Sequence, residues 1–396
     1  MLAHRLCSIK PSPTLSLNQK ANEMKSFGID VINLTLGESD FDTPSYASAG
    51  ATEFIRKGLT RYTAVDGILP LKQKICEKFK NDNQLTYQPS EIMVSTGGKQ
   101  VIFNAMMATL NPDDEVIIPA PYWVSYVDIV QIFGGRCVII PTSSDTDYKL
   151  TPEQLENAIN HKTKWLILNS PSNPTGAVYT DEELLALSKV LMTYNHVHIL
   201  SDDIYEYLIY DQEKFYNIVT VEPLLQKRTL IVNGVSKSHA MTGWRIGYGA
   251  GESSLIKAMT MLQSQSTSNP CSVAQGAALA ALSNEHTLLP IWKDDYQKRR
   301  NFVVFEISKM HNFSCILPKG AFYVYVDCAS MMNQLSLKTD VELCNLLLET
   351  YHVAVVPGSA FGCDQTFRIS YATSQDQLQK AIDRLHSLDR SVCSND

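Results

Sequence analysis

Six short apolar runs, each followed by a helix-length segment, dominate the sequence from residue 91 onward. Each run is rich in Val and Ile and is bounded by Pro, Gly, Ser or Asn, as buried β-strands are. Runs that are apolar on both faces and separated by helices are typical of parallel strands covered by helices. The pattern therefore predicts an α/β fold with an open, mostly parallel sheet. The runs are residues 91–95, 115–119, 137–141, 164–169, 196–201 and 228–233.

The C-terminal third has a different pattern, which predicts a second, smaller α/β domain. A helical pattern around residues 291–307 precedes the apolar runs 321–327, 352–356 and 366–371, and an amphipathic helix is expected over 375–388. A chain of 396 residues has room for about two to three domains. The predicted units are an N-terminal segment that packs with the small domain, a large domain and the small domain, at residues 1–45, 46–290 and 291–396.

Composition and charge exclude several classes of protein. Lys and Arg number 34 and Asp and Glu 41, a net charge of −7, whereas a nucleic-acid-binding surface needs a basic excess. No apolar run is long enough to span a bilayer. Nine cysteines, an odd number with no C-x-x-C pair, predict reduced thiols and a cytoplasmic protein. No metal site is expected, because His196 and His198 flank a strand-like run without a third ligand nearby.

Glycines and polar side chains directly follow several of the predicted strands. Ligands of open α/β sheets bind at the carboxyl ends of the strands, where these residues converge. A cleft between two domains is also a common place for a small-molecule site. We therefore expect one binding site at this edge of the sheet. The segments are 97–99 (Gly-Gly-Lys), 121–123 (Pro-Tyr-Trp), 171–174 (Pro-Ser-Asn-Pro), 202–205 (Asp-Asp-Ile-Tyr) and 236–237 (Ser-Lys).

Two stretches indicate what kind of ligand this site would take. Gly97 and Gly98 lead into a helix, whose first N–H groups can bind phosphate, although a plain capped turn has the same signature. Lys237 ends an apolar strand, and a lysine partly removed from water can form an imine with an aldehyde. Arg245 follows eight residues later and can hold a phosphate with two hydrogen bonds. Each could be a surface residue, but together they describe a cofactor with a phosphate and an aldehyde.

A further glycine-rich stretch, residues 247–252, is similar to a dinucleotide-binding fingerprint. Its sixth position is Glu252 instead of Gly, and no early βαβ unit accompanies it. We therefore expect no nicotinamide cofactor.

The stretch from 233 to 247 resembles the pyridoxal-phosphate lysine signature of class I aminotransferases. The resemblance covers nearly the whole chain and is closest to the bacterial aspartate aminotransferase branch, some members of which also accept prephenate. It implies a fold-type I transferase that forms a homodimer with shared sites. The other motifs are residues 37–44 (GESDFDTP), the Tyr62 segment, 121–123 (PYW), 172–176 (SNPTG), 201–206 (SDDIYE) and 367–371 (FRISY).

The resemblance implies a role for each matching residue around pyridoxal 5′-phosphate. Lys237 would hold the cofactor covalently and then move the Cα proton of the substrate. Asp202 would pair with the ring nitrogen and keep it protonated. Tyr205 and Asn173 would bind the ring oxygen, and Trp123 would stack on the ring. The phosphate ligands would be Gly98, Lys99, Arg245 and, from the neighbouring subunit, Tyr62.

The resemblance also implies how amino-acid and oxo-acid substrates are held. Arg368 would bind the α-carboxylate, and the backbone of Gly37 would help to close the small domain over it. Lys10 and Thr14 match family positions near the substrate side chain, and a cation at Lys10 would suit a second carboxylate. The expected reaction transfers the amino group of L-aspartate to 2-oxoglutarate in a ping-pong cycle, with prephenate as a further acceptor.

Several positions retain simpler interpretations. Asp203 could replace Asp202 as the ring partner, since the two are adjacent. Ser39 stands where the branch usually has Pro, and this difference would loosen the hinge loop. Residues with a purely structural alternative are Trp123 (core packing), Tyr62 (a turn aromatic), Arg368 (pairing with a local acid) and Lys10 (a solvated lysine).

Three other functions compete with aspartate transamination. The same lysine and aspartate would serve a C–S lyase or an aromatic aminotransferase, and dependence on an amino acceptor separates a lyase from a transaminase. A pyridoxal-sensing transcription regulator is disfavoured, because it would need a basic winged-helix domain, and only 36 residues precede Gly37.

Overall fold

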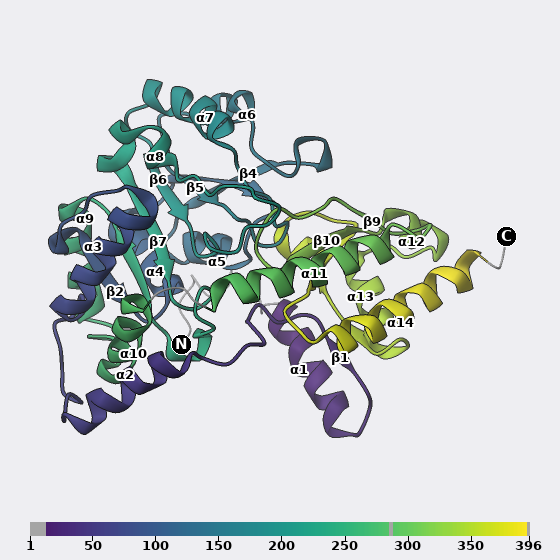
Figure 1. Cartoon of the computed structure of the whole chain (residues 1–396). Coiled ribbons are helices and arrows are strands. Elements are labelled where there is room, and N and C mark those ends of the chain that lie inside the picture. The colour runs from purple at the N-terminus through teal and green to yellow at the C-terminus, as the bar shows by residue number, and fades with distance from the viewer. Residues whose placement is uncertain (1–12, 285–287, 394–396) are drawn as a thin grey trace, which may run out of the picture.

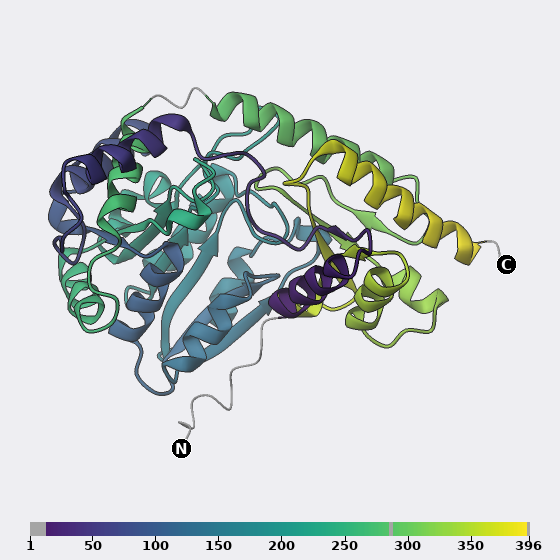
Figure 2. The same cartoon turned by 90° about the horizontal axis from the view of Figure 1, so that it is seen from below.

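The computed structural model describes residues 13–284 and 288–393. Two parts lie side by side, one containing a seven-stranded sheet and the other a four-stranded sheet (Figure 1). The helices α11 (Leu289–Ile307) and α14 (Gln375–Cys393) run next to each other along the smaller part (Figure 2). In the described ranges, no helix combines the length and the apolar character needed to cross a membrane.

The seven-stranded sheet has the order β2-β8-β7-β6-β5-β3-β4. Every neighbouring pair is parallel except those of β8, which is antiparallel to β2 and to β7. All six predicted runs are strands, so the predicted α/β fold with a mostly parallel sheet is confirmed. The strands are β2 (Ile92–Ser95), β3 (Glu115–Ala120), β4 (Arg136–Pro141), β5 (Thr163–Asn169), β6 (His198–Asp202), β7 (Thr229–Gly234) and β8 (Gly247–Ala250).

Helices cover both faces of this sheet because its strands are apolar on both faces. On β3, for example, Ile117 faces one core, whereas Val116 and Ile118 face the other. The helices of the first core are α2 (Ser45–Arg56), α3 (Leu69–Asn83), α6 (Pro152–Ala158), α7 (Asp181–Thr193), α8 (Ile218–Val221) and α10 (Ser272–Ser283). Those of the second core are α4 (Gly98–Thr109), α5 (Ser125–Ile132) and α9 (Ser253–Ser264).

The stretch 247–252, which imitates a dinucleotide fingerprint, is the strand β8 and its end. Its glycines are required by close packing: a Cβ on Gly247 would overlap the backbone nitrogen of Gly98, and one on Gly249 would lie 2.7 Å from Val101 Cγ1. The glycine spacing therefore reflects a strand pressed against the helix α4, not a turn around a dinucleotide.

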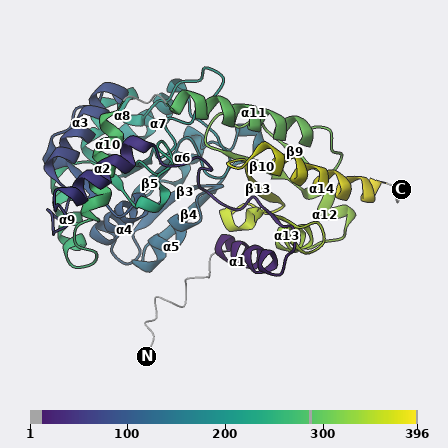
Figure 3. The ribbon, with the colours of Figure 1, turned by 60° about the horizontal axis from the view of Figure 1, so that its bottom comes forward.

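The smaller part is built on an antiparallel sheet of order β12-β13-β10-β9. A short parallel pair, β1 with β11, joins the N-terminal segment to it. The helix α1 packs beside this part through Leu17 and Ala21, which contact Leu348 and Ala354 in one apolar cluster (Figure 3). The domain boundaries at residues 45 and 290 remain predictions. The elements are α1 (Pro13–Ser26), β1 (Ile32–Asn33), β9 (Ser314–Cys315), β10 (Tyr323–Asp327), α12 (Ala329–Gln334), α13 (Asp340–Glu349), β11 (Val353–Ala354), β12 (Val356–Pro357) and β13 (Thr366–Ser370).

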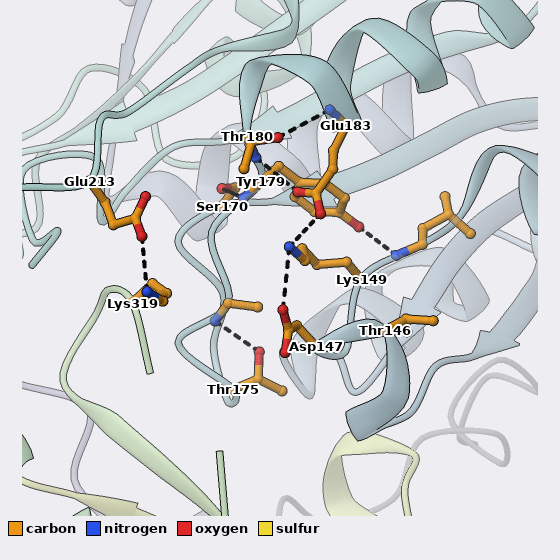
Figure 4. A network of polar contacts seen from close by, with 12 residues as sticks. Thr146, Asp147, Lys149, Ser170, Thr175, Tyr179, Thr180, Glu183, Glu213 and Lys319 are labelled. Atoms are coloured by element: carbon orange, nitrogen blue, oxygen red, sulfur yellow. Dashed lines mark hydrogen bonds and ion pairs between the residues drawn. The ribbon is translucent and has the colours of Figure 1, made fainter. Parts of the chain in front are cut away.

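Polar contacts fix the loops at the boundary between the two parts (Figure 4). Lys319, just before β10, contacts Glu213 of the larger part at 2.9 Å. Thr180 caps the start of α7 by accepting a hydrogen bond from the N–H of Glu183, whose side chain in turn accepts from the N–H of Thr180. Lys149 also reaches Glu183, at 2.5 Å. The Lys319–Glu213 contact thus joins the two parts, and the contacts of Glu183 fix the loop before α7 within the larger one.

A buried ionic network holds together the ends of β6 and β7, which carry the predicted catalytic residues. Glu206, just beyond β6, pairs with Lys78 of α3, and both side chains are buried. Its carboxylate also accepts hydrogen bonds from Asn83 at 2.9 Å and from Asn233, at the end of β7, at 2.8 Å. Glu206 thus links two strand ends to α3, and every oxygen of the buried carboxylate has a partner.

We predict that Lys78→Met destabilises the fold strongly, by about 3–5 kcal/mol, because it leaves the Glu206 carboxylate buried without a counter-charge. Urea unfolding measures the change. The matched control is Lys74→Met on the same helix, which removes only an exposed contact to Glu77 and should change the stability by less than about 1 kcal/mol. Equal effects of the two substitutions would contradict this prediction.

Candidate active site

A cavity of about 520 Å³ lies at the carboxyl ends of the central strands, facing the smaller part. Its wall comes from the large sheet, from the segment before α2 and from the four-stranded sheet. The predicted site residues that line it are Gly37, Gly98, Lys99, Trp123, Asn173, Asp202, Tyr205, Lys237, Arg245 and Arg368. Residues from distant parts of the sequence thus converge as the strand-end argument predicts.

Lys237 follows β7 and extends its amine into the cavity. Removal from water lowers the pKa of this amine to about 8, an effect that the Glu38 carboxylate opposes and that Arg368 and Arg245 reinforce. Its Nζ donates a hydrogen bond to the carbonyl of Gly37. The ring centroids of Tyr205 and Phe322 each lie 5.7 Å from Nζ. Lys237 therefore loses its proton at a lower pH than a solvent-exposed lysine does.

Asp202 ends β6 with its carboxylate buried at the cavity wall. Burial raises its pKa to about 6, and a hydrogen bond of 2.6 Å from the hydroxyl of Tyr126 opposes the shift. Asp203 does not line the cavity: its carboxylate accepts hydrogen bonds from Ser201, at 2.7 Å, and from Asn217. Adjacent residues of an extended strand point to opposite faces, which separates this doublet.

The turn into α4 is shaped to bring backbone N–H groups and a guanidinium together. Gly97 has a φ of +82°, and a Cβ there would overlap the guanidinium of Arg245. Arg245 itself has a φ of +56° and donates from Nη1 to the carbonyl of Thr242 at 2.9 Å. A helix N-terminus next to an arginine is a site for an anion such as phosphate.

Arg368, on β13, crosses from the smaller part into the cavity and is buried. Its Nη1 donates to Asn173 Oδ1 at 2.8 Å and its Nη2 to the carbonyl of Thr35 at 2.6 Å. Its Nε has no hydrogen-bond partner among the residues that the structure describes. The guanidinium lies 4.4 Å from the ring centroid of Tyr323. Within the described part of the chain, Arg368 is thus bonded to an amide and a carbonyl, not to a local acid, and it retains capacity for an anion.

Two aromatic groups complete the wall. Tyr205 and Tyr323 share a hydrogen bond of 2.7 Å between their hydroxyls. Trp123 stands edge-on to Tyr126 with ring centroids 5.3 Å apart, and the ammonium of Lys99 lies 4.9 Å from the Trp123 ring. Partial burial lowers the pKa of Lys99, Arg245 adds to this, and the Asp128 carboxylate opposes it. The part of the cavity lined by Trp123, Tyr126 and Lys99 therefore combines aromatic rings with a positive charge.

The structure places one predicted residue away from this cavity and leaves two others undescribed. The side chain of Tyr62 is 92% exposed and does not line it. Lys10 lies outside the described residues, and Thr14 belongs to α1, in a stretch where side chains are not described. The interpretation of Tyr62 as a residue that acts on a neighbouring subunit stays a prediction.

Sequence reasoning missed Tyr126, Tyr323, Glu38 and Phe361, all of which line the cavity. Tyr126 lies three residues after Trp123, at the start of α5, and its closeness to the predicted Pro-Tyr-Trp segment is a usable signal. Glu38 lies in the predicted entry motif, next to Gly37. Tyr323 and Phe361 come from the smaller part, and only the packing of the two parts brings them here.

One trio of side chains in the described ranges is spaced for a metal: His311, Asp389 and Cys393. It shares no residue with the cavity. Asp389 already accepts hydrogen bonds from the backbone N–H groups of His311 and Asn312, each at 3.0 Å, so its burial has a structural explanation.

Comparison with known proteins assigns the chain to a family. Residues 29–385 match the model of the aminotransferases of class I and II. The chain is 51% identical, over 98% of both sequences, to the aspartate/prephenate aminotransferase of Cereibacter sphaeroides. It matches the crystal structure of the aspartate aminotransferase from Rhizobium meliloti with a TM-score of 0.95 and 46% identity, over 99% of this chain and 98% of the other. The aspartate aminotransferase of Thermus thermophilus with maleate matches with a TM-score of 0.93 and 39% identity, over 98% and 99%.

The chain belongs to the class I and II aminotransferases, enzymes that exchange an amino group between amino acids and 2-oxo acids.

We predict that Gly97→Ala weakens the binding of inorganic phosphate at least about tenfold, because the added methyl displaces Arg245 from the turn. Isothermal titration of the protein without cofactor measures the affinity. Gly28→Ala is the matched control: Gly28 has a φ of +83°, but a Cβ there has nothing within 4 Å, so it carries the same backbone strain without the contact. An unchanged affinity in Gly97→Ala would contradict the phosphate assignment.

Proposed function

We propose that this chain is a pyridoxal-phosphate-dependent aspartate aminotransferase that transfers the amino group of L-aspartate to 2-oxoglutarate. One cavity contains both the Lys237 amine, whose pKa is lowered, and the buried Arg368 guanidinium, whose Nε has no hydrogen-bond partner among the described residues, and this pairing carries the proposal. The first provides an amine for an aldehyde, and the second a site for a carboxylate. The names of the relatives support aspartate as donor, and the Cereibacter relative's name supports prephenate as a further acceptor.

The donor set of the cavity fits pyridoxal phosphate. An amine, a buried carboxylate and a helix N-terminus with Arg245 match the aldehyde, the ring nitrogen and the phosphate of that cofactor. The Cβ-free position at Gly97 leaves space where a phosphate would approach the backbone. Trp123 offers an indole face on the same wall. We infer that Lys237 binds the aldehyde carbon, Asp202 the ring nitrogen, and Gly98, Lys99 and Arg245 the phosphate.

When bound, the cofactor supplies an electron sink next to the substrate Cα. Asp202 would keep a proton on the ring nitrogen, and Tyr126 orients this carboxylate through its hydrogen bond of 2.6 Å. The amine of Lys237 would take the Cα proton of the substrate and pass a proton to the former aldehyde carbon of the cofactor, and in the second half of the cycle it would move a proton in the opposite direction. Its pKa of about 8 suits an amine that must both accept and donate a proton near neutral pH.

Arg368 and Asn173 orient the substrate. A carboxylate that accepts two N–H groups of Arg368 would be fixed in its plane, which would limit the orientations that the substrate Cα–H bond can take in the cavity. The amide of Asn173 holds Nη1 of Arg368 at 2.8 Å and so sets the direction of the guanidinium. Tyr205 would bind the ring oxygen. Its hydroxyl is hydrogen-bonded to that of Tyr323, whose own ring lies against the guanidinium of Arg368.

The second carboxylate of aspartate or glutamate requires a further cation. We propose Lys10, with Thr14 near the substrate side chain, as the sequence resemblance implies. Lys99 is an alternative among the described residues, because it lines the cavity and its ammonium lies 4.9 Å from the centroid of the Trp123 ring. The aspartate aminotransferase of Thermus thermophilus takes maleate, a dicarboxylate, in its structure, which supports a site of this charge in the family.

We also propose a homodimer with shared sites and a cytoplasmic location. A second cavity of about 870 Å³ adjoins Arg245 and Thr96, and an exposed aromatic such as Tyr62 of the partner subunit would fit there. The eight described cysteines are all free thiols, which agrees with a reducing compartment. We propose residues 45 and 290 as the boundaries about which the small domain moves.

The test of the function is amino-acceptor dependence. With pyridoxal phosphate and L-aspartate, we expect oxaloacetate to accumulate only when 2-oxoglutarate is added, in equal amount to glutamate, as coupled assays of both products measure. Release of ammonia and a 2-oxo acid from a thioether amino acid without an acceptor would instead favour the C–S lyase alternative. Faster turnover of phenylalanine than of aspartate would favour an aromatic aminotransferase.

The two candidate cations can be separated by substitution. If Lys10 binds the second carboxylate, Lys10→Ala raises the KM for aspartate about tenfold or more, the loss of roughly one charged hydrogen bond, and leaves the KM for alanine unchanged. Lys99→Ala is the matched comparison, and its effect on cofactor affinity is measured at the same time. Selective loss of aspartate in Lys99→Ala, with none in Lys10→Ala, would move the assignment to Lys99.

A further inference from the structure

The segment of residues 37–43 lies against the loop that carries Lys237. The carbonyl of Gly37 accepts a hydrogen bond from Lys237 Nζ. Glu38 accepts one from the hydroxyl of Thr242 at 3.1 Å, and Thr43 donates one to the carbonyl of Ala240 at 3.1 Å. Just before the segment, the carbonyl of Thr35 holds Arg368 at 2.6 Å. The position of this stretch therefore sets two backbone contacts inside the cavity.

The opposite side of the same segment is fastened to α11. Phe41 stacks on Trp292 with ring centroids 5.0 Å apart and planes 8° from parallel. Asp40 accepts two hydrogen bonds from Arg299, at 2.8 and 2.9 Å. The hydroxyl of Ser39 lies 2.7 Å from the hydroxyl of Tyr296. The three consecutive residues 39–41 thus contact one face of α11, which belongs to the smaller part.

Ser39 contributes a contact that a proline at this position cannot make. Its hydroxyl accepts the N–H of Phe41 at 3.2 Å, so it can at the same time donate to Tyr296. Tyr296 is 1% exposed, and its hydroxyl is hydrogen-bonded to that of Ser39. A buried hydroxyl that loses its partner is unfavourable, so each group of the pair holds the other in place.

We propose that Ser39 and Tyr296 form a hydroxyl latch that makes residues 37–43 move with α11 as one body. As positioning residues they act on substrates through the Gly37 and Thr35 backbone, which contact Lys237 and Arg368. The latch rests on the proposed function, because it governs how firmly the smaller part holds an amino or oxo acid. It gives Ser39 a role in how the smaller part closes over the cavity.

The test compares Ser39→Ala, Tyr296→Phe and the double substitution in the holoenzyme. We expect each to raise the KM for both substrates and the Kd of maleate about three- to tenfold, with kcat and cofactor affinity changed less than about twofold. The KM and Kd values of the double variant should be no higher than those of the more impaired single variant, since all three variants lose the same hydrogen bond. Ser39→Thr keeps the hydroxyl and should restore the wild-type values.

A merely structural role predicts a different result. Tyr179→Phe is the matched control: it removes another buried hydroxyl, which accepts the N–H of Leu150 at 2.8 Å outside the cavity (Figure 4), and should lower the melting temperature without changing KM. If Ser39→Ala and Tyr296→Phe behave like this control, or if their effects on KM add, the latch is wrong. Wild-type enzyme inert with aspartate would instead overturn the proposed function, and the variants would then be compared with the amino acid that wild type accepts.

Discussion

The burial of one amine at the end of β7 is the constraint on which the site depends. An ammonium that loses water is destabilised, so the cavity lowers the pKa of Lys237 to about 8 and makes its amine available. That same loss of water would be intolerable without the acids nearby, and Glu38 and Asp202 both favour the charged form. The nearby acids therefore raise the pKa of Lys237, whereas burial and the charges of Arg368 and Arg245 lower it.

The surrounding structure supplies rigidity where this balance needs it. Glu206 links the ends of β6 and β7 through Asn233 and Lys78, so Asp202 and Lys237 keep a fixed separation. On the anion side, close contact between β8 and α4 requires glycine at position 247, and the turn at Gly97 leaves room for the Arg245 guanidinium. These two glycines serve both the packing of the fold and the proposed anion site, because neighbouring groups lie so close to them that no side chain fits.

Much of this was predictable from the sequence, because strand ends and periodicity are local signals. The six strands, the rim residues and the convergence of Lys237, Asp202, Asn173 and Arg368 follow from apolar runs and from the resemblance to a family. The strand β8 was missed because its four residues include two glycines, which are typical of a turn. Tyr323 and the Ser39–Tyr296 contact could not be predicted, since they depend on how two separately folded regions face each other. The resemblance favoured Asp202 over Asp203, and in the structure Asp202 lines the cavity whereas Asp203 does not.

The most direct measurement is the absorbance spectrum of the protein with pyridoxal phosphate, recorded before and after aspartate and then after 2-oxoglutarate. We expect the band of the lysine-bound cofactor to form, to give way to that of the aminated cofactor with aspartate, and to return with 2-oxoglutarate. We also expect that Lys237→Ala never forms the first band. A protein in which Lys237→Ala still forms that band, or in which aspartate leaves the wild-type spectrum unchanged, would contradict the central claim.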